Sequence, residues 1–221
     1  MYSRSRVRAV RLIAALCIVF VSTGTNAASV AVSEWQSAFA ARPDAVNGGK
    51  LFQICVVCHG GDAAGNPNGS VPAIAGQHYQ VIIKQIVDFR HARRWDLRME
   101  RFVDEHNLRR PQDVADVADF VAHVPRAWPV TIGSGEFLPA GTDAYIARCA
   151  SCHGASGVGS NTNRIPRIAG QHQQYLVRQM QDAADGRRPN MSAAHIVTLR
   201  RMTYAEIQGI ADYLSRIPPQ H

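Results

Sequence analysis

The pentapeptide Cys-x-x-Cys-His occurs twice, at residues 55–59 and at residues 149–153. In c-type haem attachment this motif supplies two cysteines that bond to one porphyrin and a histidine that ligates its iron. The same spacing also occurs in zinc half-sites and in thiol redox pairs, but two copies inside one longer repeat favour haem. We therefore predict two covalently bound haem c groups. The expected attachment residues are Cys55, Cys58, Cys149 and Cys152, and the expected proximal iron ligands are His59 and His153.

The longer repeat has an offset of 94 residues, as from Cys55 to Cys149. Each motif histidine is followed by a glycine and, 13 residues later, by a proline that opens the phrase Pro-x-Ile-Ala-Gly-Gln-His, at 72–78 and 166–172. The sequence Ala-Asp-aromatic also recurs, at 118–120 and 211–213. A repeat of this length indicates one small domain that has been duplicated, since solenoid units are shorter.

Residues 1–28 are typical of a secretory signal peptide. Four arginines lie before residue 12, an apolar run follows at 12–21, and Thr-Asn-Ala-Ala at 25–28 offers small residues for cleavage. The apolar run of about ten residues is shorter than the roughly 20 that a membrane-spanning helix needs, which disfavours an uncleaved anchor. We therefore expect export to the periplasm and a mature chain with no transmembrane segment.

Cleavage would change both the cysteine count and the charge. The chain has five cysteines, and with Cys17 removed the other four all lie in the two motifs, which leaves none for a disulfide or a nucleophile. The 24 Lys and Arg would fall to 20 against 17 Asp and Glu, so the formal net charge would fall from +7 to +3. No basic stripe with interleaved aromatic residues is present, so we expect no nucleic-acid partner.

The remaining chain has the length of two small domains. The expected boundaries are a first domain at 42–124, a linker rich in Pro and Gly at 125–140, and a second domain at 141–221. Helical spacing appears at 80–89, 111–123, 174–183 and 204–216, whereas no segment alternates with a period of two. The predicted fold class is all-α.

The order of these features resembles the class I cytochrome c fold. Each half reads Gly-x-x-x-aromatic, Cys-x-x-Cys-His-Gly, Pro-x-Ile-Ala-Gly-Gln-His, a helix, a methionine region and a terminal Ala-Asp-aromatic helix. Duplicated, this order is similar to the di-haem cytochrome c4 family over about residues 44–217. The resemblance implies two tandem cytochrome c domains. In each, an aromatic residue of the terminal helix would meet one before the haem motif: Phe120 with Phe52, and Tyr213 with Tyr145.

The resemblance also implies a methionine thioether opposite each motif histidine. In the first half Met99 is the only methionine between the haem motif and the terminal helix, so it is the predicted ligand. In the second half Met191 is predicted, because it lies, like Met99, in the loop after an Arg-Arg pair. Met202, His106 and His195 also lie in or next to these two segments, and they stay open as alternative ligands.

Other repeated residues have supporting roles. Pro72 and Pro166 resemble the proline whose preceding backbone helps to orient the proximal histidine. The Gln-His pairs at 77–78 and 171–172 are expected to pack or to cap helices rather than to bind iron. The arginine pairs at 93–94 and 187–188 could bind haem propionates, or they could be solvated.

The predicted function is electron transfer in the periplasm by a protein that is not an enzyme. Donors would be a respiratory complex or a dehydrogenase, and acceptors a terminal oxidase or reductase. Iron with six filled positions leaves no site for substrate chemistry. Two alternatives stay open. One is the cytochrome subunit of a periplasmic dehydrogenase complex, and docking to a membrane complex is compatible with both readings. The other is a haem enzyme such as a peroxidase, which needs an open or displaceable iron position.

Overall fold

The structure is a computed structural model, and it describes residues 24–126 and 130–218. Over these ranges the elements are helices, joined by loops that contain one isolated bridge between Ser160 and Ile165. The prediction of an all-α fold is confirmed. None of the helices in these ranges combines the length and the apolar character needed to cross a membrane. The predicted signal peptide lies outside the described residues, except that residues 24–28 begin the first helix.

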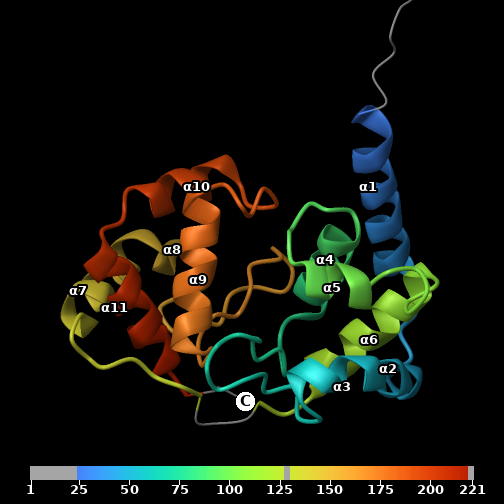
Figure 1. The fold of residues 1–221 in the computed structure, drawn as a ribbon, viewed down its shortest axis with the longest axis horizontal. Coiled ribbons are helices and arrows are strands. Elements are labelled where there is room, and N and C mark those ends of the chain that lie inside the picture. Colours follow the sequence, from blue (N-terminus) through green and yellow to red (C-terminus); the bar gives the residue numbers. More distant parts are fainter. Residues whose placement is uncertain (1–23, 127–129, 219–221) are drawn as a thin grey trace, which may run out of the picture.

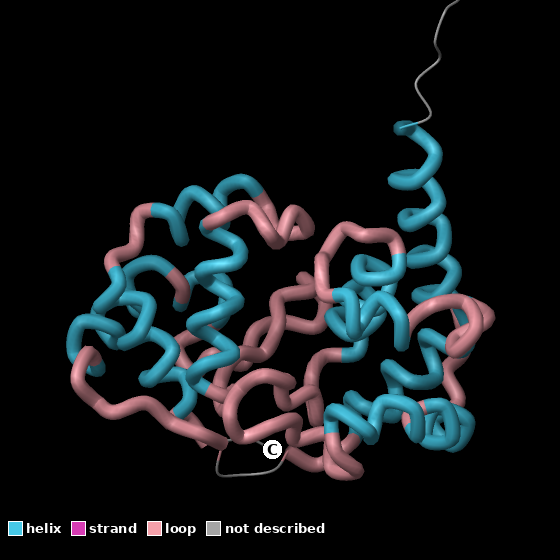
Figure 2. Tube along the Cα trace, in the orientation of Figure 1, coloured by secondary structure: helices cyan, strands magenta, loops and turns pink. Residues whose placement is uncertain are grey.

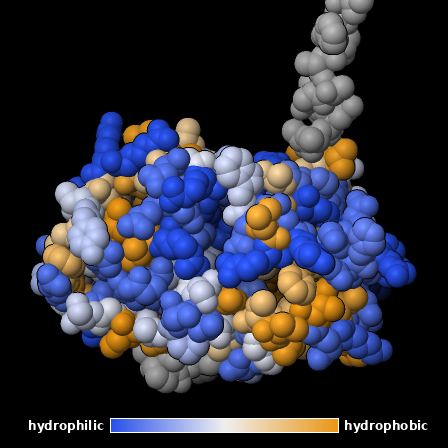
Figure 3. Space-filling model, viewed as in Figure 1, coloured by the Kyte–Doolittle hydropathy of each residue, from blue (hydrophilic) through white to orange (hydrophobic). Residues whose placement is uncertain are grey.

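Two helical bodies lie side by side (Figure 1). The first comprises α1 (Gly24–Ala40), α2 (Ala45–Leu51), α3 (Gln53–His59), α4 (Tyr79–Arg90), α5 (Leu97–Phe102) and α6 (Pro111–His123). The second comprises α7 (Leu138–Arg148), α8 (Ala150–His153), α9 (Gln173–Ala184), α10 (Ala193–Arg200) and α11 (Tyr204–Ser215). Loops from both bodies fill the seam between them (Figure 2), and this seam is largely hydrophilic on the face shown in Figure 3.

Each body is organised around one close helix crossing, of α2 with α6 and of α7 with α11. A Cβ atom on Gly141 would lie 1.8 Å from the carbonyl carbon of Gly209. A Cβ atom on Gly48 would lie 2.0 Å from the carbonyl oxygen of Asp116. Only glycine permits such an approach of two backbones, which explains why a glycine precedes each haem motif.

The aromatic residues meet at these crossings as the resemblance implied. The ring centroids of Phe52 and Phe120 are 5.3 Å apart, and those of Tyr145 and Tyr213 are also 5.3 Å apart. Phe52 and Tyr145 are almost completely buried. The crossing helix and the cysteine-bearing helix are separate elements, because the chain bends at Phe52 in one half and at Cys149 in the other.

The predicted helices at 80–89, 111–123, 174–183 and 204–216 correspond to α4, α6, α9 and α11. A short helix follows each arginine pair. Met191 lies in the loop before α10, as predicted, whereas the prediction of a loop at Met99 was wrong. The Asp96 carboxylate accepts a hydrogen bond from Arg98 N at 3.1 Å and starts α5, and Ser192 does the same for His195 N at 3.3 Å and starts α10. Both are standard N-cap residues. Met99 therefore lies in a helix.

The core of the first body extends to α1, which precedes the expected domain start at residue 42. Ala31 and Ala38 are buried against it. Glu34 forms an ion pair with Arg90, and its other oxygen lies 2.6 Å from His91 Nε2. The first domain of the structure therefore includes α1.

Candidate haem centres

The two motif histidines occupy equivalent, buried positions. His59 ends α3 and His153 ends α8, and their rings are 5% and 9% exposed. In each ring Nδ1 lies 3.1 Å from a proline carbonyl oxygen, that of Pro72 or of Pro166. A carbonyl oxygen only accepts, so Nδ1–H donates to it and Nε2 keeps a free lone pair. Burial also lowers the pKa of both imidazoles. A neutral, oriented imidazole is the form that binds a metal.

A tight glycine loop carries each proline to its histidine. Gly65 N donates to His59 O at 2.8 Å, and Gly159 N donates to His153 O at the same distance. Gly65 has φ of +77°, and a Cβ atom there would lie 2.4 Å from Pro72 O. The glycines after each motif are therefore needed to close the loop. The oxygen that orients each histidine belongs to the proline itself and not to the residue before it.

The motif cysteines have unequal surroundings. Cys55 and Cys149 pack against the two cores, whereas Cys58 and Cys152 are exposed. Burial raises the pKa of the Cys55 and Cys149 thiols to about 11, the opposite of the lowered pKa in redox-active thiol pairs. The part of the chain that the structure describes also contains no cluster of three or more metal-binding side chains. The raised pKa of these thiols disfavours a thiol redox pair.

The predicted sixth ligands differ in what surrounds them. Met99 packs partly buried against the first core, and Met191 packs partly buried against the second. The His106 side chain is 94% exposed and lies 3.7 Å from Asp104, so it points to solvent. The His195 ring, in contrast, lies with its centroid 6.1 Å from that of His153. Met202 is a buried member of the second core.

The structure separates the members of each arginine pair. Arg93 and Arg187 are largely exposed and pair with carboxylates, Arg93 with Asp88 at 3.5 Å and Arg187 with Asp182 at 2.8 Å. Arg94 is buried in the seam between the domains. Its guanidinium donates to three partners: Gln85 Oε1 at 2.7 Å, Tyr175 OH at 2.7 Å and Gln179 Oε1 at 2.6 Å.

Arg188 lies close to Arg94 in this seam. Burial and the neighbouring charge of Arg94 lower the pKa of Arg188 to about 9. Its Nε atom is buried with no hydrogen-bond partner among the described residues, and the same holds for Nη1 of Arg126. Buried donors of this kind need a hydrogen-bond acceptor, and a carboxylate forms the strongest such bond with a guanidinium. The carboxylates of haem propionates fit that requirement, so the residues of the seam fit the predicted cofactor.

The repeated glutamines clamp the two domains together. The Gln171 side chain accepts from Ala73 N at 3.0 Å and donates to Ala73 O at 2.7 Å. Gln77 does the same in the opposite direction, accepting from Arg167 N at 2.9 Å and donating to Arg167 O at 2.8 Å. Ala73 and Arg167 are equivalent at the repeat offset of 94. Each domain thus forms hydrogen bonds with the residue that follows the proline of the other domain, and that proline orients the motif histidine.

The repeated histidines of the Gln-His pairs complete this exchange. His78 Nε2 lies 2.7 Å from Val158 O, and His172 Nε2 lies 2.8 Å from Ala64 O. Ala64 and Val158 are again equivalent in the repeat. These pairs were expected to pack or to cap helices, and their contact with the other domain was not predicted. The sequence did contain an indication of this contact. Reciprocal hydrogen bonds between two similar domains require the same polar residues in both halves, and the Gln-His pair occurs in both.

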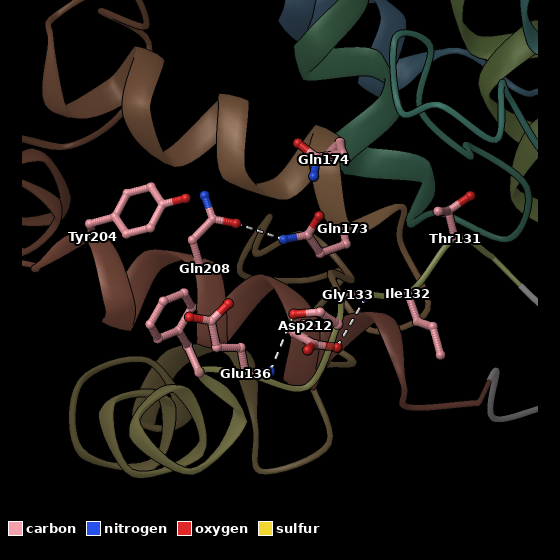
Figure 4. Close-up of a pocket in the computed structure, with 11 residues that line it drawn as sticks. Thr131, Ile132, Gly133, Glu136, Gln173, Gln174, Tyr204, Gln208 and Asp212 are labelled. Atoms are coloured by element: carbon pink, nitrogen blue, oxygen red, sulfur yellow. Dashed lines mark hydrogen bonds between the residues drawn. The ribbon is translucent and has the colours of Figure 1, made fainter.

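A cavity of about 250 Å³ lies in the second domain, away from both motifs (Figure 4). It is bounded by the linker, the start of α9 and the outer face of α11. Asp212 accepts from Gly133 N at 3.1 Å and from Gly135 N at 2.6 Å, and Gln173 donates to Gln208 at 2.9 Å. The Asp212 bonds fasten the linker to α11, and the Gln173 bond fastens α9 to α11. The cavity therefore lies where these three segments pack together.

Comparison with known proteins assigns the family. The sequence matches the Cytochrome c family over residues 45–125 and 139–218. Cytochrome c4 of Pseudomonas aeruginosa is 31% identical over 179 residues, which cover 77% of this chain and 87% of that protein. The chain belongs to the cytochrome c family, in its di-haem, c4-like branch.

Two further comparisons concern a solved structure and a named relative. The crystal structure of reduced recombinant cytochrome c4 from Pseudomonas stutzeri has the same fold, with a TM-score of 0.71 and 23% identity over 80% of this chain and 100% of that one. A protein of Stutzerimonas stutzeri named thiosulfate dehydrogenase electron acceptor is 30% identical over 172 residues, 74% of this chain and 78% of that protein.

This cytochrome therefore carries two haem motifs in two cytochrome c domains. The cysteines at 55, 58, 149 and 152 fit two covalently bound haems, as predicted. Together with its relatives, this identifies a di-haem electron-transfer cytochrome.

Proposed function

We propose that this cytochrome carries electrons in the periplasm, from a respiratory complex or a dehydrogenase to a terminal oxidase or reductase. The observation that supports this most is the pair of buried histidines, each hydrogen-bonded to a proline carbonyl, in two domains that are hydrogen-bonded to one another. Such rigid sites suit electron exchange, because little has to reorganise when the charge on the iron changes.

Each side chain has a defined task in this proposal. Cys55, Cys58, Cys149 and Cys152 form the thioether bonds. His59 and His153 present Nε2 to the iron, and Met99 supplies the opposite ligand in the first domain. Arg188 and Arg126, whose buried donors lack partners among the described residues, bind propionates in the seam. Arg94 adds a buried positive charge beside Arg188. When bound, each haem supplies one iron that exchanges a single electron.

Partner docking would use the apolar surface around the first centre. Val57 lies between the two motif cysteines and is 79% exposed, and Leu97, two residues before Met99, is 84% exposed. Trp95 is also exposed in the same segment. Small apolar contacts of this kind are typical of weak, transient redox encounters.

A test of carrier against enzyme follows from the named relative. The oxidised holoprotein is mixed with thiosulfate alone, and then with thiosulfate and a thiosulfate dehydrogenase. We expect reduction only with the dehydrogenase present, followed by reoxidation on addition of membranes that contain a terminal oxidase. Reduction by thiosulfate alone, or turnover of hydrogen peroxide, would instead show that the chain is an enzyme.

A second function is favoured by the same relative, whose name describes an electron acceptor of one dehydrogenase. In that case this chain would be the cytochrome subunit of a stable complex. Affinity purification from the periplasmic fraction at low and at physiological salt distinguishes the two. A dehydrogenase retained in a fixed ratio supports the subunit, and a chain recovered alone supports the carrier.

N-terminal sequencing of the same sample tests cleavage after residue 27 or 28.

A further inference from the structure

The two centres differ on the side opposite the proximal histidine. In the first domain the histidine of the ligand segment, His106, points to solvent. In the second domain His195 faces His153, with ring centroids 6.1 Å apart and ring planes inclined by 53°. We propose that His195, and not a methionine, is the sixth ligand of the second haem. This inference rests on the second haem itself being bound.

The separation of the two rings is what an iron between them requires. A bond from imidazole nitrogen to a metal is about 2 Å long, and the ring nitrogen lies about 1 Å from the ring centre. Two such ligands on opposite sides of one iron therefore have centroids about 6 Å apart. The planes of the two rings need no fixed relation, because each ring can turn about its own iron–nitrogen bond.

The helix α10 is held so that His195 faces inward. Ser192 caps its first turn by accepting from His195 N. Leu199, four residues after His195 and so on the same helix face, is buried in the second core. At the far end, Arg200 Nε donates to Ala184 O at 2.7 Å and ties α10 to the end of α9.

The His195 ring is also free to bind. Among the described residues no hydrogen bond to its ring nitrogens is formed, in contrast to His59, His78, His153 and His172. Burial, together with the charge of Arg188, lowers the pKa of its imidazole.

The predicted ligand Met191 is tied to a different neighbour. The residue before it, Asn190, donates through Nδ2 to Asp88 Oδ2 at 2.9 Å, and its carbonyl accepts from Lys84 at 3.4 Å. Both partners lie on α4 of the first domain. The backbone just before Met191 is thus fastened toward the domain seam, while the Met191 side chain packs partly buried against the second core.

Unlike ligands would give the haems unlike reduction potentials. A thioether sulfur favours ferrous iron and raises the potential, whereas an imidazole does not. The second haem would then have the lower potential. An electron that enters the second domain would pass across the seam to the first and leave from there.

The test uses the holoprotein and two matched histidine substitutions, His195→Ala and His106→Ala. We expect the ferric wild type to show one bis-imidazole signal by electron paramagnetic resonance. It should show the near-infrared sulfur-to-iron band at the intensity of one haem. His195→Ala should remove the bis-imidazole signal and give a high-spin haem that free imidazole restores, and His106→Ala should change neither. His195→Met, which keeps a ligand in place, should raise the lower potential and double the near-infrared band.

Two outcomes would overturn the inference. One is a wild-type near-infrared band at the intensity of two haems that Met191→Leu reduces by half, since Met191 would then be the ligand. The other is a second haem that is already high-spin in the wild type. A haem count of two per chain in every variant separates either result from a failure of the proposed electron-transfer function, in which the haems would be absent or would not be reduced reversibly.

Discussion

The side-chain amide of Gln171 forms two hydrogen bonds with the backbone of Ala73 in the other domain. Ala73 directly follows Pro72, whose carbonyl orients His59. One glutamine of the second domain therefore supports the histidine of the first. Gln77 supports His153 in the same way, through Arg167 and Pro166. The hydrogen bonds that dock the two domains therefore also support the orientation of the motif histidines.

Gln171→Ala should change the haem of the opposite domain. Two hydrogen bonds at about 1 kcal/mol each would be lost, so we expect docking to weaken by about 1–3 kcal/mol. The hydrogen bond that His59 Nδ1–H donates to Pro72 O would weaken, which makes the imidazole a less basic ligand. The first haem should then have a raised potential, with the second nearly unchanged.

Redox titration of Gln171→Ala, with the domain signals resolved spectroscopically, measures this effect. Gln77→Ala should show the mirror result, and the exposed Gln181→Ala is the control. Equal shifts at both haems in either variant would mean that the glutamines act only on overall stability.

Gly141→Ala should destabilise the second domain severely. The new Cβ atom would overlap the backbone of Gly209 at 1.8 Å, and neither backbone can move without breaking the crossing of α7 and α11. We expect a loss of at least about 3 kcal/mol in the free energy of unfolding. Denaturant titration of the holoprotein measures it. Gly61→Ala, where a Cβ atom meets nothing within 4 Å, is the control and should cost less than about 1 kcal/mol. Similar losses in both variants would refute the crossing.

Arg94→Gln should lower the reduction potential of the nearer haem. A buried positive charge favours the ferrous state, so its removal favours the ferric state by on the order of tens of millivolts. Arg93→Gln alters the neighbouring, solvent-exposed guanidinium, and we expect it to change the potential much less. Potentiometric titration at constant salt compares the two. A larger shift for Arg93→Gln would contradict the role of Arg94 as the buried positive charge near the haem.

Acidification should weaken the contact between the domains. Burial lowers the pKa of His78 below its usual 6.5, and the charges of Arg167 and Arg126 lower it further. Between the lowered value and 6.5 the unfolded chain binds more protons than the folded chain, so stability falls as the pH falls through this window. Unfolding free energies measured on both sides of pH 6.5 give the slope. His78→Gln should flatten it, and the exposed His106→Gln should not. An unchanged slope in His78→Gln would exclude His78 as its source.

Much of this architecture could be predicted from the sequence. The helices follow from local patterns. The aromatic pairs at the two crossings were implied by the resemblance to cytochrome c. So was a role for Pro72 and Pro166 beside the motif histidines, although the orienting oxygen is the proline's own. The sequence could not separate Arg93 from Arg94 or Met191 from His195. These residues lie close together in the chain, and only the rotation of a short helix or loop decides which of them faces inward.

The contact between the domains is the larger feature that was not predicted from the sequence. Gln77 and His78 were expected to serve their own helix, and Gln77 Oε1 does accept from His78 N at 3.0 Å. Their partners lie 80 and more residues away in the chain. Pattern arguments within one half cannot find such partners.

The central claim is that this chain exchanges two electrons, one at each of two covalently bound haems. A potentiometric titration of the purified holoprotein, combined with quantification of haem c per chain, tests it most directly. We predict two haems per chain and two reversible one-electron steps at separate potentials, with no reaction toward hydrogen peroxide. A single haem, or one iron that stays out of the titration and turns over peroxide, would contradict the account.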